Sequence, residues 1–418
     1  MRKIGLEQPY ATIQLYFSTR LVCTQLCRLK VYLNRETGQF VVSSVGGERY
    51  QAFVPAPLPP DPPLALDGEL LQWLEKANRA IGRLDGISDV LPDSHLFLYQ
   101  YIRKEALLSS QIEGTQSSFS DLLLFELEEV PGVPLDDARE VSNYIAAMNH
   151  GLARLAEGFP LSLRLLREIH AILLQGGRGS NKQPGEFRRS QNWLGGSRPG
   201  NAIFVPPPPE RLMECLDSFE RFLHDETGTT PVLLKASLAH VQFETIHPFL
   251  DGNGRLGRLL ITLILINEGV LHEPLLYLSL YFKTHRADYY DHLQRVQQEG
   301  DWERWLRFFL QGVYETAQQA VDTVRTVLTL FEQDRERIRG LGRIAGSCLQ
   351  LHHRLQQKVI VNIPDTAQAL EINRTTISNC MKRLQEVGIV REITGQRRNR
   401  LFVYDRYVQI LSEGTEPL

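Results

Sequence analysis

One twelve-residue segment, His247–Arg258, constrains the fold of this 418-residue chain more than any other. It reads HPFLDGNGRLGR, and an apolar run with a single threonine follows it at residues 259–266. Such a run predicts a buried helix. The segment then lies at the helix N-terminus, where unpaired backbone N–H groups and the helix dipole favour a bound anion. We therefore expect a phosphate-binding helix start.

The side chains of this segment suit a nucleotide-transfer site. Asp251 offers a carboxylate for Mg²⁺, which proteins usually hold through one or two carboxylates together with substrate phosphates. Arg255 and Arg258 are three residues apart, so they share a helix face and can both reach a polyphosphate. His247 precedes the helix, in a position to take a proton from an attacking hydroxyl.

Two other loop types do not fit this stretch. An EF-hand that starts at Asp251 needs a ligand at its fifth position and a glycine at its sixth, where this chain has Arg255 and Leu256. A P-loop needs a Gly-Lys-[Ser/Thr] sequence, which does not follow here. Calcium-loop and P-loop readings are therefore excluded.

Composition indicates an ordinary soluble globular protein, with 43% apolar and 23% charged residues and room for two or three domains. The net charge of −3 gives no overall attraction to nucleic acid or membrane, so any basic patch must be local. Five scattered cysteines indicate a reducing compartment without a disulfide framework. No apolar run reaches the roughly 20 residues of a membrane span. We expect a cytoplasmic protein without a membrane partner.

Helical periodicity dominates the chain from Asp67 onward. The expected helices cover residues 94–112, 119–129, 136–156, 161–175, 210–225, 231–244, 253–268, 284–299 and 312–338. A proline-rich strap over residues 54–63 precedes them. An irregular segment rich in Gly, Arg, Asn and Pro interrupts them at residues 176–209, and so long a connection is usually functional or disordered.

The last part of the chain has a different pattern. Two helices, Asp365–Leu370 and Arg374–Val387, flank a tight turn, and two strands follow at residues 389–394 and 400–404. A helix-turn-helix followed by a hairpin is typical of a winged helix. Residues 372–406 carry eight basic and three acidic side chains. Both DNA binding and protein docking through this unit stay open.

Two motifs give the chain a resemblance to the Fic family. His247–Arg258 matches every defined position of the family pattern H-P-F-x-[D/E]-G-N-G-R-x-x-R. Upstream, Ser109–Gly114 reads SSQIEG at the end of an expected helix and fits the family's inhibitory pattern, [S/T]-x-x-x-E-[G/N]. The resemblance extends over most of the chain from about residue 48, and places it in the class with an N-terminal inhibitory helix.

The resemblance implies a mainly α fold: an all-helical Fic core with a short β-hairpin flap, plus the C-terminal winged helix-turn-helix. We expect an N-terminal tail over residues 1–46 and a Fic N-terminal helical region with the inhibitory helix over 47–130. The catalytic core then covers 131–311, a connecting helix 312–345, and the winged helix 346–411.

The implied activity is transfer of AMP from ATP, with Mg²⁺, to a Ser, Thr or Tyr hydroxyl of a target protein or of the chain itself. His247 would be the catalytic base, Phe249 the anchor of the loop and Asp251 the metal ligand. The residues that would bind the phosphates of ATP are Gly252, Asn253, Gly254, Arg255 and Arg258. The flap that positions the target chain corresponds to Ile203, Phe204 and Val205.

The inhibitory motif supplies Glu113 and Ser109. The resemblance implies that the Glu113 carboxylate pairs with Arg258 and occupies the space that the ATP γ-phosphate needs. It leaves three alternatives open. The chain could be a DNA-binding regulator with a sensory or vestigial core. It could transfer another phosphate-containing group, or it could remove AMP from a modified target.

Overall fold

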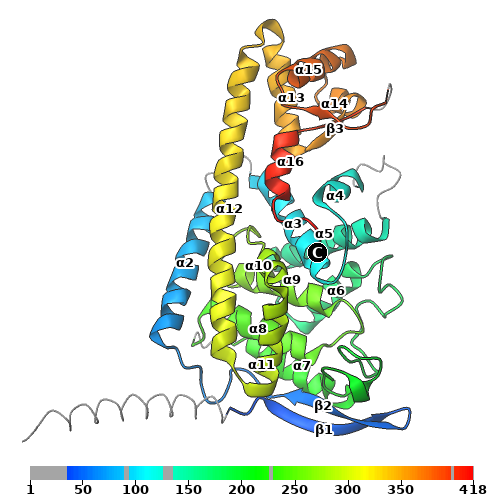
Figure 1. Cartoon of the computed structure of the whole chain (residues 1–418), viewed down its shortest axis with the longest axis vertical. Helices are drawn as coiled ribbons and strands as arrows, with labels where there is room; N and C mark the ends of the chain where they lie inside the picture. Colours follow the sequence, from blue (N-terminus) through cyan, green and yellow to red (C-terminus); the bar gives the residue numbers. More distant parts are fainter. Residues whose placement is uncertain (1–34, 89–93, 126–134, 226–228, 397–399, 418) are drawn as a thin grey trace, which may run out of the picture.

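A computed structural model describes residues 35–88, 94–125, 135–225, 229–396 and 400–417 of the chain. Helices form most of the molecule, and its described strands pair in two small sheets (Figure 1). The mainly α fold class expected from the sequence is confirmed. Residues 1–34, most of the expected N-terminal tail, lie outside the described ranges.

The end of the expected tail is instead a β-hairpin. Strand β1 (Gly38–Val45) pairs antiparallel with β2 (Glu48–Pro55), with Phe40 opposite Phe53. Gly46 and Gly47 link the strands with φ of 58° and 85°, a combination that favours glycine and suits a two-residue hairpin turn. The expectation of a tail up to residue 46 is therefore wrong for Gly38–Val45, because the turn at Gly46 and Gly47 pairs these residues with β2.

A helical core follows the hairpin. Its helices are α2 (Gly68–Ser88), α3 (Ser94–Ile112), α4 (Phe119–Phe125), α5 (Leu135–Ala156), α6 (Leu163–Leu173), α7 (Pro209–Leu223), α8 (Val232–Ile246), α9 (Asn253–Asn267), α10 (Ser279–Thr284) and α11 (Arg286–Glu299). Helices α8 and α9 pack against each other and are buried along most of their length, as expected for the apolar run after the motif.

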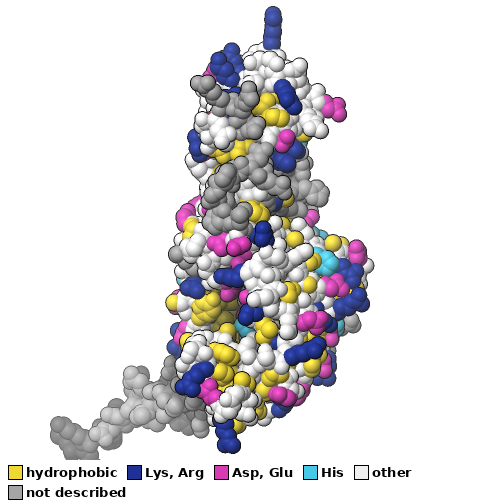
Figure 2. All heavy atoms as spheres, turned by 90° about the vertical axis from the view of Figure 1, so that its right-hand side faces the viewer, with side chains coloured by type: hydrophobic (Ala, Val, Ile, Leu, Met, Phe, Trp, Pro, Cys, Tyr) yellow, Lys and Arg dark blue, Asp and Glu magenta, His cyan; other side chains and the backbone are white. Residues whose placement is uncertain are grey.

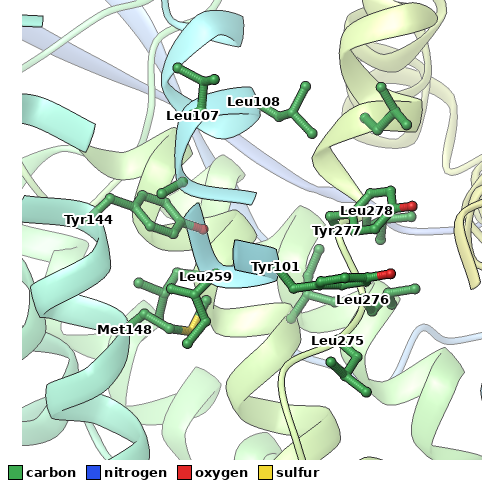
Figure 3. Close-up of a cluster of buried hydrophobic side chains, with 14 of the residues drawn as sticks. Tyr101, Leu107, Leu108, Tyr144, Met148, Leu259, Leu275, Leu276, Tyr277 and Leu278 are labelled. Carbon is green, nitrogen blue, oxygen red and sulfur yellow. The ribbon is translucent and has the colours of Figure 1, made fainter. Parts of the chain in front are cut away.

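Helix α3 is built into the middle of this core. Figure 3 shows its residues Leu107 and Leu108 in a cluster with Tyr144 of α5 and Leu259 of α9. Leu107, Leu108, Tyr144 and Leu259 are fully buried. The apolar packing fixes the position of α3, and through it the position of the inhibitory motif at its C-terminal end.

Helix α12 (Trp302–Arg339) runs along the molecule and connects the core to the C-terminal unit (Figure 1). It is one continuous helix of 38 residues, so the separate connecting helix expected to start at residue 312 is wrong. Gly312 does not interrupt it. A Cβ there would lie 2.6 Å from the ring of Tyr281, so the glycine instead permits close packing of α10.

The C-terminal unit contains the expected helix-turn-helix, α14 (Ile363–Ala369) and α15 (Arg374–Glu386). Three short strands pair antiparallel in the order β3 (Ile360–Asn362), β5 (Leu401–Val403), β4 (Arg391–Glu392). Helix α13 (Ala345–Gln357) and strand β3 were not expected from the sequence. Helix α16 (Asp405–Ser412) then returns to the core and contacts α3, α4 and α12 (Figure 1).

The face of the molecule drawn in Figure 2 carries side chains of both charges. Figure 2 shows basic and acidic side chains interspersed, without a large field of one sign on that side. Within the described ranges, every helix is too short or too polar to cross a lipid bilayer.

A buried ion pair joins the segment before β1 to α12. The Arg35 guanidinium donates to both carboxylate oxygens of Glu303, at 3.0 and 2.9 Å, and to the Gly300 carbonyl oxygen at 2.9 Å. Glu303 also accepts the backbone N–H of Ala65 at 2.7 Å. Both charged side chains are almost inaccessible to water, so each one depends on the other to neutralise its charge.

We predict that Glu303→Ala lowers the free energy of unfolding by about 3–5 kcal/mol, because it leaves Arg35 buried and unpaired. Urea titration followed by circular dichroism would measure the change. The matched control is Glu336→Ala on the exposed surface of the same helix, where we expect a change of about 0.5 kcal/mol or less. Equal effects of the two substitutions would contradict a structural role for the Arg35–Glu303 pair.

Candidate functional site

The twelve-residue segment forms the turn between α8 and α9. His247 ends α8 in a left-handed conformation, with φ 48° and ψ 61°, and Gly252 precedes α9 with φ 77°. These two residues reverse the chain, so that the His247 ring and the N-terminus of α9 line one cavity of about 570 Å³. The expected phosphate-binding helix start therefore faces an open space beside the expected base.

Buried contacts hold the turn rigid. Phe249 is fully buried, and its ring stacks on His170 with 3.7 Å between centroids. The Asn253 Oδ1 accepts the Phe249 N–H at 2.9 Å, while its Nδ2 donates to the Phe249 carbonyl oxygen at 2.8 Å. The anchoring contact expected for Phe249 is present. The Asn253 side chain, expected at the phosphates, is instead bonded to the loop backbone.

Three further residues support the turn and were not identified from the sequence as site residues. His170 accepts the Gly185 N–H at Nδ1 (2.8 Å), so its Nε2 is the donor to the Asp251 carbonyl oxygen at 2.9 Å. Arg188 donates through Nε to the His247 carbonyl oxygen at 2.9 Å, and Asn192 donates to that of Phe249, also at 2.9 Å. Arg188 and Asn192 belong to the irregular segment, whose length was the only signal of their role.

His247 has the tautomer that a general base needs. Its Nδ1 lies 3.2 Å from the Glu244 carbonyl oxygen, and donation there leaves Nε2 as the acceptor. Burial lowers the pKa of His247 to about 4, so the ring is neutral at pH 7. Glu244 is itself buried beside α9, and burial raises the pKa of its carboxyl to about 7.

Arg258 is bound by the inhibitory motif. Its Nε donates to the Ser109 Oγ at 2.9 Å, and its Nη2 donates to the Ser109 carbonyl oxygen at 3.0 Å and to the Glu113 carboxylate at 2.7 Å. Arg258 is buried, with only 3% of its surface exposed. Burial alone would raise the pKa of Glu113, but the charge and hydrogen bond of Arg258 together with the charge of Arg255 outweigh burial, and the pKa is lowered. Glu113 is thus held as a carboxylate.

The Glu113 carboxylate also reaches the first turn of α9. A Cβ built on Gly254 would lie 2.1 Å from the Glu113 Oε1, so a larger residue there would displace this carboxylate. The carboxylate therefore occupies the place where a helix N-terminus favours an anion. Gly252 and Gly254 both line the cavity, although the Gly252 N–H points to the Asp251 carboxylate, at 2.6 Å.

Arg255 has carboxylate partners as well. It is buried, and its Nη1 lies 2.8 Å from Glu140 of α5, while its Nη2 lies 3.5 Å from the Asp251 carboxylate. Glu140 also pairs with Arg178 at 3.1 Å. The sequence did not reveal Glu140 or Arg178, because both contacts join segments far apart in the chain. Arg255 lies on the cavity wall with Arg258, as their three-residue spacing predicts.

The expected flap is a single β-bridge over the cavity. Leu194 pairs with Phe204, with the Leu194 N–H 2.8 Å from the Phe204 carbonyl oxygen. Ile203 is 71% exposed, and both Ile203 and Phe204 line the cavity. Val205 differs from them. Its side chain is buried against Tyr50 and Ala52 of β2, and its carbonyl oxygen accepts the Phe53 N–H at 2.8 Å.

Helix α11 supplies the remaining wall of the cavity. Tyr289, Tyr290, Leu293, Gln294 and Gln297 line it. Tyr289 is buried and its hydroxyl bonds to His240 at 2.9 Å, whereas Tyr290 is 43% exposed. Apolar side chains bordered by glutamine amides suit a planar aromatic ring with polar edges, such as a nucleobase.

The fold and the site define a helical protein with an anion-binding helix start, a neutral histidine beside it, and its own carboxylate in the anion position. Two family models match the chain: Fic/DOC family N-terminal over residues 71–153 and Fic/DOC family over residues 160–265. Both matched segments are thus similar to domains of the Fic/DOC family.

Relatives named protein adenylyltransferase Fic are similar to parts of the chain. The one from Culex quinquefasciatus is 32% identical over 63% of this chain and 54% of its own length. The one from Aedes aegypti is 34% identical over 54% of this chain and 44% of its own. For the one from Drosophila melanogaster, 34% identity extends over 43% of this chain and 33% of its own. The chain thus spans about a third to a half of these relatives.

A solved structure shares the fold. The crystal structure of a Fic family protein from Desulfovibrio desulfuricans G20 aligns with a TM-score of 0.54 and 20% identity. The alignment covers 82% of this chain and 97% of that chain. At this identity the likeness extends to the fold alone.

We predict that His247 stays neutral well below the pKa of about 6.5 of a free histidine, because burial disfavours its charged form. NMR titration of ¹³C-labelled histidine, with the His247 signal assigned by its loss in His247→Ala, would measure this directly. The unfolded chain takes up this proton first, so this group weakens the fold as the pH falls from about 6.5 to 4. A midpoint near 6.5 would contradict the buried, neutral ring.

Proposed function

We propose that the protein is an adenylyltransferase, which transfers AMP from ATP to a Ser, Thr or Tyr hydroxyl of a target protein and of itself, and that Glu113 inhibits it. One observation carries the proposal: a neutral histidine and an anion-binding helix start share one cavity, and Glu113 occupies the anion position. The relatives named protein adenylyltransferase Fic support it.

In this reaction His247 is the base. Its Nε2 accepts the proton of the target hydroxyl, whose oxygen then attacks the α-phosphorus of ATP. A P–O bond forms, the bond to the leaving oxygen breaks, and pyrophosphate departs. The backbone N–H of Gly254 and the guanidinium of Arg255 bind phosphate oxygens, and so does the Gly252 N–H once it leaves the Asp251 carboxylate. Arg258 does so once Glu113 has left it.

The residues of the site fit a magnesium ion. Asp251 lines the cavity beside the helix start, and its carboxylate is about one third exposed. No cluster of three metal-binding side chains exists within the described ranges, so the remaining ligands would be ATP phosphates and water, as is usual for Mg²⁺. The ion would neutralise charge on the phosphates. Asp251 would hold it, and the ion pair with Arg255 orients Asp251.

The target chain would lie along the flap. Ile203 and Phe204 are available to contact it, while the buried Val205 anchors the flap to β2. Cytoplasmic location remains part of this proposal, as do the domain limits expected from the sequence, apart from the tail up to residue 46 and the separate helix from residue 312.

We predict that Glu113→Gly raises self-labelling with radiolabelled ATP by about ten- to a hundredfold. The reason is that a charge-assisted hydrogen bond is worth about 1.5–3 kcal/mol, and each 1.4 kcal/mol is roughly a factor of ten. The freed Arg258 can then pair with a phosphate. Autoradiography of the purified protein after incubation with ATP and Mg²⁺ would give the rate.

The control is the double variant with His247→Ala, in which labelling should fall to background while ATP still raises the melting temperature. Intact-mass analysis of Glu113→Gly with ATP, UTP or CTP would identify the transferred group. An increment other than AMP points to a different transferase. If the unsubstituted chain strips AMP from a labelled target and Glu113→Gly does not, Glu113 takes part in AMP removal and is not a simple inhibitor.

A second candidate function is DNA binding by the C-terminal unit. The first nine residues of α15, Arg374–Lys382, contain no carboxylate, and their exposed side chains are hydrogen-bonding or cationic. Arg374, Asn379 and Lys382 are among those exposed. A recognition helix needs such a surface to reach base edges and phosphates.

We predict that the full chain shifts duplex DNA in a gel in a salt-dependent manner, and that Lys382→Glu weakens the binding by about tenfold or more. Lys76→Glu on α2, far from this unit, is the matched control and should leave the shift unchanged. Absence of a shift at 50 mM salt would leave protein docking as the role of the unit.

A further inference from the structure

The chain ends against the inhibitory helix. After α16, residues Glu413–Pro417, here called the tail, lie beside α3 and α10. We propose that the tail holds the end of α3 in place and thereby keeps Glu113 on Arg258, so that the C-terminal unit controls the site. This inference rests on the proposed inhibitory role of Glu113, and it names the part of the chain that sets it.

The first contact is at Gln111, two residues before Glu113. The Gln111 Nε2 donates to the Thr415 carbonyl oxygen at 2.8 Å and to the Ser117 carbonyl oxygen at 2.9 Å. Gln111 is fully buried and Thr415 is 2% exposed, so water does not readily replace this bond. The Gln111 carbonyl oxygen in turn accepts the Gly114 N–H at 3.0 Å. The tail thus bonds to the turn that carries Glu113.

The second contact is at Lys283 of α10. Its Nζ donates to the Gly414 carbonyl oxygen at 3.2 Å and also to that of Glu416. The backbone of Gly414 lies so close to α10 that a Cβ there would be 2.8 Å from a methyl group of Leu280. The Lys283 ammonium and the contact between Gly414 and Leu280 thus fix the tail on both sides of Thr415.

Charge complementarity supports the same arrangement. Lys104 of α3 is buried and lies over the Tyr277 ring, and its Nζ has no hydrogen-bond partner among the described residues. Burial lowers the pKa of Lys104 to about 8, and the carboxylates of Glu413 and Glu416 counteract this effect. Two acidic residues in a tail of five therefore lie near two buried lysines, Lys104 and Lys283.

The tail is joined to the C-terminal unit without a free linker. Tyr407 and Leu411 of α16 are buried, and α16 contacts α3, α4 and α12. At the start of α16, the Tyr404 hydroxyl donates to Asp334 of α12 at 2.7 Å. Figure 1 shows α16 descending from the C-terminal unit to α3. A ligand that shifts this unit relative to α12 would pull on the tail.

Thermodynamic linkage explains how the tail would control the position of Glu113. The tail makes its contacts with α3 in the position that places Glu113 on Arg258. If α3 has one position with Glu113 on Arg258 and another with Glu113 released, a segment that binds the first position more tightly favours it. The equilibrium between the two positions shifts by the difference in binding free energy. Removal of the tail should therefore raise the fraction of molecules in which Arg258 is free for ATP.

The test is a truncation after Ser412, which removes the tail and leaves all of α16. We expect self-labelling with ATP and Mg²⁺ to rise by about three- to thirtyfold, because the hydrogen bonds of Gln111 and Lys283 to the tail are lost, and to stay at or below the level of Glu113→Gly. Truncation after Glu416 keeps these contacts and should label as the full chain does. In the Glu113→Gly background, truncation after Ser412 should raise self-labelling by less than twofold.

A point substitution guards against misfolding of the truncated chain. Lys283→Met removes the donor to the tail and should raise labelling by about threefold, whereas Lys358→Met at an exposed position should not. Hydrogen exchange should become faster at residues 107–113 in both the truncation and Lys283→Met.

The outcomes separate the two proposals. Strong labelling by Glu113→Gly, with neither the truncation nor Lys283→Met above the full chain, overturns the role of the tail. A multiplicative gain on top of Glu113→Gly also overturns it, because the tail would then act elsewhere. If Glu113→Gly is itself silent, the proposed function fails, and hydrogen exchange alone decides: faster exchange at residues 107–113 supports the tail contact, and unchanged exchange refutes it.

Discussion

The ion pair between Arg258 and Glu113 is the interaction on which the arrangement of the site depends. It joins the helix that carries the phosphate site, α9, to the helix that carries the inhibitory motif, α3. Arg258 is buried, so loss of its partner would leave a charge that needs another anion. In the proposed reaction, a phosphate of ATP is such an anion. One guanidinium would then serve both the closed and the substrate-bound state.

The rest of the site is rigid around this exchangeable pair. The Asn253 amide and the stacked rings of Phe249 and His170 fix the turn, and Arg188 fixes its backbone from the other side. A preorganised base and anion site need little rearrangement when substrate binds. Under the proposed inhibition, the end of α3 is the part that would move, and the tail is bonded there at Gln111.

Several elements of the fold and of the site could be predicted from particular residues. The apolar run after Arg258 predicted a buried helix, and α9 is one. The hairpin β1–β2 was missed although Gly46-Gly47 signals it, and α16 was missed because its eight residues carry too few periodic positions. Glu140, Arg178 and Arg188 could not be found, since ordinary charged residues gain a role only from partners distant in the chain.

The sequence by itself determined the chemistry available: a histidine, a carboxylate, two glycines and two arginines at the spacing of a helix start. That spacing is local, so it is readable without the fold. Only the tertiary structure decided that Asn253 is bonded to the loop, that Val205 is buried, and that the tail meets Gln111. These facts depend on packing between distant segments, which fixes burial, and burial decides whether each polar group faces substrate or protein.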